Sequence, residues 1–326
     1  MNILFLIGNG FDINLGMDTR YSDFYKYYAS VTSTNNLILK LKKEIENNIK
    51  NWSDLELAFG KHTKHLSSTK EFNEVFVDIE DNLADYLGGI ESQFDINKMD
   101  VKKLYSYLVF PENSLPQADK NELLNFKNKW ANKQWNISVI TFNYTQILEK
   151  LLKYNGKHIQ INSHLSNVNQ SILIQRIEHI HGFIDDRMVM GVNDISQISN
   201  NAFHNNQEVL ESLVKKDCNK AQKHTVDDRC KNLISNSNLI CIFGSSIGDT
   251  DKMWWQQVGE QLKKDCKLVI FEKGEIVSRR RPQKRLIVER KIKKIFLEKT
   301  NLNDKEKEAA KNNIYVGVNS NMFKLN

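Results

Sequence analysis

The stretch NILFLIGNGFD, residues 2–12, decides the expected fold of this chain of 326 residues. Its first six residues are apolar apart from Asn2 and stop at Gly8, which is the pattern of a short strand buried on both faces. Further runs of this kind lie at residues 137–142, 239–243 and 267–271, and a less pure run at residues 176–181 stops at Gly182. Helical stretches separate the runs, and this alternation is typical of a mostly parallel sheet covered by helices on both faces.

The connection between the first two predicted strands is far longer than one crossover between parallel strands needs. Apolar residues recur in it at helical spacing, as at Leu37, Leu41 and Ile45 and again from Val75 to Leu87. We therefore expect residues from about 20 to 130 to form a helical insertion. The whole chain, residues 1–326, is then one α/β domain with a Rossmann-like, mostly parallel sheet and a large helical insertion between its first two strands.

Composition excludes several classes of protein. Hydrophobic residues make up 40% of the chain and charged residues 26%, which fits neither a disordered chain nor a membrane protein. No apolar run approaches the roughly 20 residues of a membrane-spanning helix, and the first residues lack the basic start of a secretory signal. The four cysteines form no CxxC pair, which argues against zinc ribbons and disulfide scaffolds. We therefore expect a cytoplasmic protein without membrane contact.

The net charge of +6 is concentrated near the C-terminus. Residues 273–299 hold 11 Lys and Arg against 3 Glu, so this basic segment carries +8 and the rest of the chain −2. The basic segment contains Arg279, Arg280 and Arg281, and such a cluster can attract nucleic acid. A solvated helix face explains the same pattern, and we favour that interpretation.

The loop after the first strand is a candidate for nucleotide binding. Its residues are Gly8, Asn9, Gly10 and Phe11, and glycines there let the backbone turn tightly and approach a phosphate. The dinucleotide fingerprint GxGxxG is incomplete, because Ile13 occupies the third glycine position. A tight turn without a ligand is the competing interpretation, and nucleotide contact is the one we favour.

A second loop, FGSSIGDTD at residues 243–251, follows another buried strand. Its small residues make it a second candidate nucleotide cradle, and an Asp/Thr cap precedes the next helix. The candidate ligand-binding residues of this loop are Gly244, Ser245, Ser246 and Asp249. An ordinary loop with a good helix cap is the competing interpretation, and for this loop alone it is the stronger one.

The segment TFNYT, residues 141–145, lies at the carboxyl end of a predicted strand, where open α/β sheets bind ligands. Asn143 offers both a donor and an acceptor, which suits a ribose hydroxyl or a fixed water. Capping of the following helix by Asn143 or Thr145 explains these residues equally well.

The segment EHIHG, residues 178–182, carries the most reactive side chains. The period of a strand places His179 and His181 on one face, and a histidine there can act as a general base near neutral pH. A hydrogen-bonded structural histidine is one competing interpretation. A metal pair is another, but no spacing supplies its further ligands, so we expect no metal.

Several sequence blocks, taken in order, resemble the bacteriophage abortive infection AbiH family. They are ILFLIGNGFD (3–12), TRYSDF (19–24), WSDLE (52–56), FNY (142–144), IHG (180–182) and FGSS (243–246). The resemblance runs from the first residue to about residue 260. The same landmarks are similar to a divergent sirtuin-type fold.

The sirtuin-type resemblance implies that Asn143 and His181 contact and activate the ribose of NAD. It also implies that the nucleotide cleft is lined by Gly8, Gly10, Gly244 and Ser245. Two features depart from that group. The zinc-binding cysteines of deacetylase sirtuins are missing, which argues against peptide deacetylation. Phe11 and Asp12 replace the small residues usual after the first glycines, which leaves room for a ligand other than NAD.

From these resemblances we expect an anti-phage abortive-infection protein that hydrolyses the nicotinamide–ribose bond of NAD. Cleavage builds oxocarbenium character on the ribose, as in glycoside hydrolysis. His181 would deprotonate a ribose hydroxyl or water, Asn143 would hold that water, and Asp12 would stabilise positive charge. Two other functions stay open: a toxin or binder directed at nucleic acid, and a nucleotide sensor without catalysis. The phage trigger and a homo-oligomeric state also stay open.

Overall fold

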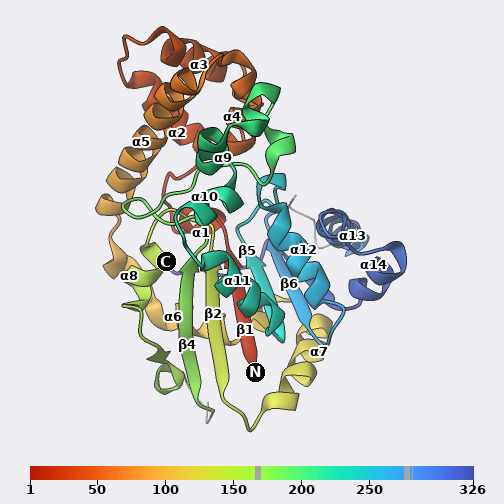
Figure 1. The fold of residues 1–326 in the computed structure, drawn as a ribbon. Coiled ribbons are helices and arrows are strands. Elements are labelled where there is room, and N and C mark those ends of the chain that lie inside the picture. The colour runs from red at the N-terminus through yellow and green to blue at the C-terminus, as the bar shows by residue number, and fades with distance from the viewer. Residues whose placement is uncertain (166–169, 275–279, 281) are drawn as a thin grey trace.

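The computed structural model describes residues 1–165, 170–274, 280 and 282–326 and shows an α/β fold (Figure 1). The described residues form a seven-stranded sheet in the order β3-β4-β2-β1-β5-β6-β7. Only the short edge strand β3 is antiparallel to its neighbour, and the other described strand pairs are parallel. The predicted α/β class with a mostly parallel sheet is therefore confirmed.

Five of the described strands lie where the sequence shows apolar runs, whereas β4 begins and ends earlier than the predicted run 176–181 and the two-residue β3 follows no such run. Their bounds are Asn2–Ile7 (β1), Trp135–Thr141 (β2), Ile159–Gln160 (β3), Ile172–His179 (β4), Leu239–Phe243 (β5), Lys267–Glu272 (β6) and Ile314–Val318 (β7). The central strands are buried along nearly their whole length because helices cover both faces of the sheet.

The order in which the chain builds the sheet creates an opening at its centre. After β1 the chain adds β2 and β4 on one side, and it then returns to β1 to add β5, β6 and β7 on the other side. The loops that follow β1 and β5 therefore lead away in opposite directions. In open parallel sheets this reversal leaves a crevice at the carboxyl ends of the strands.

Each face of the sheet has its own hydrophobic core. On one face, Phe5 and Val139 pack against α6 (Val101–Val109), α7 (Gln117–Lys127) and α8 (Ile147–Leu152). On the other face, Leu6 and Ile242 pack against α11 (Val226–Ser235), α12 (Lys252–Gln261) and α13 (Pro282–Glu298). A last helix, α14 (Asp304–Lys311), precedes β7.

A third hydrophobic core lies above the carboxyl ends of the strands (Figure 1). It is built by helices α2 (Tyr21–Ser30), α3 (Asn36–Asn47), α4 (Leu55–His62), α5 (Thr69–Gln93) and α9 (Gln207–Leu213). We call these five helices the helical cap. Helices α2 to α5 belong to the connection between β1 and β2, whereas α6 and α7 of the same connection pack on the sheet.

Among the described residues, no helix combines the length and the apolar character that crossing a membrane requires. The four cysteines are free and buried.

Candidate functional site

A cleft of about 500 Å³ lies at the carboxyl ends of β1 and β5, between the sheet and the helical cap. A hollow of about 300 Å³ adjoins it and shares Gly10, Ile13, Arg20 and the loop after β5. The cap contributes Tyr21 and Glu56 to the wall of the cleft. These volumes fall in the range of small-molecule and cofactor sites.

The predicted glycines line the cleft, and their first role is to pack two loops against each other. The N–H of Gly8 donates to the carbonyl of Phe243 (2.9 Å), and the N–H of Gly10 donates to the carbonyl of Gly244 (2.8 Å). A Cβ atom on Gly10 would lie 2.4 Å from the Cα of Gly244, so only glycine permits this approach. The N–H groups of Gly8 and Gly10 are thus already paired within the protein.

The remaining predicted ligand-binding residues have different environments. Asn9 lines the cleft, but its side chain exchanges two hydrogen bonds of 2.6 Å with Thr19. Phe11 is buried against Phe323, with a ring separation of 5.3 Å. Asp249 pairs with Lys299 at 2.6 Å, outside the cleft lining. Two further predicted residues that do line the cleft are Ser245 and Ser246.

The two histidines of EHIHG do not share a strand face, because β4 ends at His179. The N–H of Gly182 bonds back to the carbonyl of His179, and this turn gives His181 a different orientation. His179 contacts Glu149 through Nε2 at 2.6 Å. Although burial lowers the pKa of His179, the contact with Glu149 raises it above its usual value overall. His181 instead lines the cleft.

His181 is held as a neutral imidazole. Its Nε2 lies 2.9 Å from Oδ1 of Asp251 and 3.3 Å from Nζ of Lys215. Because a carboxylate oxygen can only accept, we assign the ring proton to Nε2, which donates it to Asp251. Burial, together with the charge of Lys215, lowers the pKa of His181 to about 4. Its Nδ1 is buried and has no hydrogen-bond partner among the described residues. Nδ1 is therefore the basic atom that the ring can offer, with Asp251 fixing the tautomer.

Lys215 connects this pair to the helical cap. Its Nζ donates to Oδ1 of Asp251 (2.8 Å) and to Oε2 of Glu56 (2.7 Å), and all three groups are largely buried. The hydroxyl of Tyr144 lies 2.9 Å from Oε1 of Glu56. Burial raises the pKa of Glu56 above its usual value. We call Glu56, His181, Lys215 and Asp251 the buried network.

The family model described as "Bacteriophage abortive infection AbiH" matches residues 4–272, which is well over half of the chain. The chain belongs to the AbiH family. This confirms the resemblance seen in the sequence, and it indicates a role in bacteriophage abortive infection. The match contains the whole buried network and ends before helix α13. No curated protein matches the chain.

Three members of the buried network could not be predicted from the sequence. Glu56 lies in the WSDLE block of the AbiH resemblance, but the block alone suggests no role for it. In the loop after β5, the sequence favours Asp249, whereas Asp251 is the aspartate that reaches the cleft. Lys215 lies in α10 (Lys215–Ala221), and no local pattern distinguishes it from the many solvated lysines of the AbiH chain.

Asp12 and Asn143 form a second polar group, which lies apart from the cleft lining. The side-chain amide of Asn143 donates to Oδ1 of Asp12 (3.0 Å), and the hydroxyl of Thr145 donates to Oδ2 (2.5 Å). All three residues are buried. The group fastens helix α1 (Gly10–Asn14), which follows β1, to the loop after β2. Burial raises the pKa of Asp12 to about 7, although both hydrogen bonds oppose that shift.

Replacing Asp12 with asparagine is expected to change how stability depends on pH. The carboxyl titrates near pH 4 when the chain is unfolded and near pH 7 when it is folded, so the wild type loses stability as the pH rises through this window. Asp12→Asn removes this loss of stability, because the asparagine side chain does not titrate. Urea unfolding should show the variant gaining on the order of 2 kcal/mol relative to wild type between pH 5 and pH 8. The exposed Asp228→Asn serves as control, and equal pH profiles for Asp12→Asn and wild type would contradict the assignment.

The basic segment lies partly outside the described residues, which exclude Arg279 and Arg281. Arg280 is exposed. Helix α13 carries the described part, on the face of the sheet that α11 and α12 also cover. The segment does not line the cleft of the AbiH chain, although Lys273 at its start borders the adjoining hollow.

Proposed function

We propose that this AbiH-family protein acts in phage abortive infection by hydrolysing the bond between nicotinamide and ribose in NAD. The observation that carries the proposal is His181, a neutral base fixed by Asp251 in a cleft at the reversal point of the sheet. When the short strand β3 is left out, the order of the parallel strands is that of the Rossmann dinucleotide-binding fold. This order supports a dinucleotide as ligand.

The charges around the cleft suit the nicotinamide and the pyrophosphate of NAD. Asp54, Glu56 and Asp251 lie along its wall and favour the cationic nicotinamide, although Lys215 offsets part of their charge. Arg20 borders both the cleft and the adjoining hollow, where its guanidinium can contact phosphate oxygens. We place the nicotinamide ribose near His181 and the pyrophosphate near Arg20.

In the proposed reaction, the buried Nδ1 of His181 becomes accessible when NAD and a water enter the cleft, and it takes a proton from that water. The water oxygen bonds to C1′ of the ribose, and the bond from C1′ to the ring nitrogen breaks. The electron pair of that bond neutralises the nicotinamide ring. The transition state carries positive charge on the ribose, which the carboxylate of Asp54 can stabilise. We assign Asp12 and Asn143 to joining helix α1 to the loop after β2 and not to contact with the ribose.

The test is to incubate the purified protein with NAD, with and without a lysate of phage-infected cells, and to measure nicotinamide and ADP-ribose. The proposal expects both products in equal amounts, and a fall of cytoplasmic NAD during infection. Saturable NAD binding without products under both conditions would favour a nucleotide sensor and contradict hydrolysis. Growth arrest with steady NAD and degraded RNA would favour the nucleic-acid function instead.

A further inference from the structure

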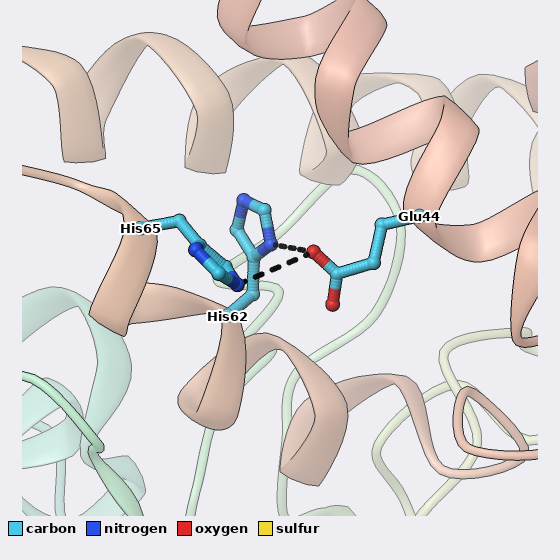
Figure 2. A group of neighbouring side chains, drawn as sticks. All are labelled: Glu44, His62 and His65. Atoms are coloured by element: carbon cyan, nitrogen blue, oxygen red, sulfur yellow. Dashed lines mark hydrogen bonds and ion pairs between the residues drawn. The ribbon is translucent and has the colours of Figure 1, made fainter.

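Outside the cleft, three side chains of the helical cap converge on one point (Figure 2). Glu44 lies on α3, His62 is the last residue of α4, and His65 ends the short 3-10 helix Thr63–His65. Their nearest nitrogen and oxygen atoms all lie within 4.8 Å of one another. Among the described residues, this is the one group of three such side chains with that spacing.

We propose that Glu44, His62 and His65 bind a zinc ion, which fastens α3 to α4. Two imidazoles and one carboxylate form a ligand set that zinc adopts in proteins, with water completing the tetrahedron. This proposal is independent of the NAD proposal, because none of the three residues lines the cleft.

The geometry requires only small side-chain movements. Zinc holds nitrogen and oxygen ligands at about 2.0–2.2 Å, so neighbouring ligand atoms of a tetrahedral site lie about 3.4 Å apart. Nδ1 of His62 is 2.8 Å from Oε2 of Glu44, and Nε2 of His65 is 3.8 Å from the same oxygen. The first distance must lengthen slightly and the second must shorten slightly. The two histidine nitrogens, which lie within 4.8 Å of each other, must also reach this spacing. A rotation of the exposed His65 side chain can supply the second movement.

The position of His65 distinguishes a metal site from a simple hydrogen bond between His62 and Glu44. The contact between His62 and Glu44 is a good hydrogen bond and needs no further partner. His65 points its Nε2 at the same carboxylate oxygen from beyond hydrogen-bond distance, as Figure 2 shows. A cation between the three atoms accounts for this convergence.

The site is partly preorganised. His62 is buried, and its ring packs beside Trp52 (6.0 Å) and Phe59 (6.1 Å), so its orientation is fixed before any ion binds. Zinc binding at Nδ1 would place the single ring proton of His62 on Nε2, because a ligating nitrogen must be unprotonated. The neighbouring Lys61 and Lys64 oppose a cation, but both side chains are exposed to water and therefore screened.

Helix α4 connects this site to the cleft. Glu56 lies in its first turn and His62 at its end, which places them about 9 Å apart along the helix axis. An ion that fastens His62 to α3 would therefore steady the helix that carries Glu56.

The test measures zinc binding by the full chain after treatment with a chelator. We expect one Zn²⁺ per chain by isothermal titration and elemental analysis, and a rise in Tm on adding Zn²⁺. His65→Ala should weaken zinc affinity at least 10-fold and abolish the rise in Tm, because losing even an outer partner of a metal ligand costs about 10–100-fold. Glu44→Gln should weaken affinity in the same direction.

The control is His158→Ala, which removes an exposed histidine elsewhere and should bind zinc like the wild type. His65 is half-exposed, so its loss should leave the fold intact, which circular dichroism checks. Zinc binding of equal strength in wild type and His65→Ala, or no binding by the folded wild type, would overturn the proposal. Neither result bears on nicotinamide release, which is measured separately.

Discussion

Replacing His181 with alanine is expected to slow nicotinamide release by about 10²–10⁴-fold, the usual contribution of a general base. At 1.36 kcal/mol per tenfold, this is roughly 3–5 kcal/mol of transition-state stabilisation. NAD affinity should fall much less, because the proposed phosphate contacts come from Arg20 at another part of the cleft. Steady-state rates together with equilibrium binding of NAD to the variant separate the two effects.

The matched control is His158→Ala, whose exposed side chain lies outside the cleft, and it should keep the wild-type rate. Thermal unfolding must show that His181→Ala is folded, since a substitution at a buried position can destabilise the domain. Neutralising Arg279, Arg280 and Arg281 together should leave cleavage nearly intact. If that triple variant loses toxicity while folded His181→Ala keeps it, the function belongs to the basic segment and not to the cleft.

The strands of the sheet could be predicted because burial on both faces leaves a plain signal. Residues 2–7 and 239–243 are apolar runs that stop at a glycine, and the structure begins and ends β1 and β5 at those positions. The bounds of β4 differ from the predicted run 176–181, because the strand spans Ile172–His179. Exposed Gln175 and Arg176 interrupt its apolar pattern, and the turn that precedes Gly182 begins at His179.

The buried network could be predicted only in part, because its members come from distant parts of the chain. Lys215 lies 159 positions after Glu56, and the two meet only when the helical cap closes over the sheet. The sequence alone does not distinguish a lysine that is buried in the fold from one that is exposed to solvent. His181 could be found because it follows a predicted strand, where ligand sites of parallel sheets occur.

Replacing Lys215 with methionine is expected to lower the free energy of unfolding by about 3–5 kcal/mol, the usual cost of breaking a buried ion pair. The substitution keeps the bulk of the side chain but leaves the carboxylates of Glu56 and Asp251 without their shared cation. Urea unfolding at pH 7 measures the change. Lys216→Met, at the exposed next position, is the matched control and should change stability by less than about 0.5 kcal/mol.

The dependence of this loss on pH distinguishes a charge effect from a packing effect. Although burial opposes it, the charge of Lys215, together with His181, holds the pKa of Asp251 below its usual value. The stability that this interaction contributes is therefore present above the unfolded pKa of about 4 and is lost as the pH falls below it. The gap between wild type and Lys215→Met should thus be widest near neutral pH and narrow below about pH 5. Adding Asp251→Asn to Lys215→Met removes the unpaired charge and should restore part of the stability at pH 7. A gap that stays constant with pH, with no recovery in the double variant, would mean that Lys215 acts through packing alone.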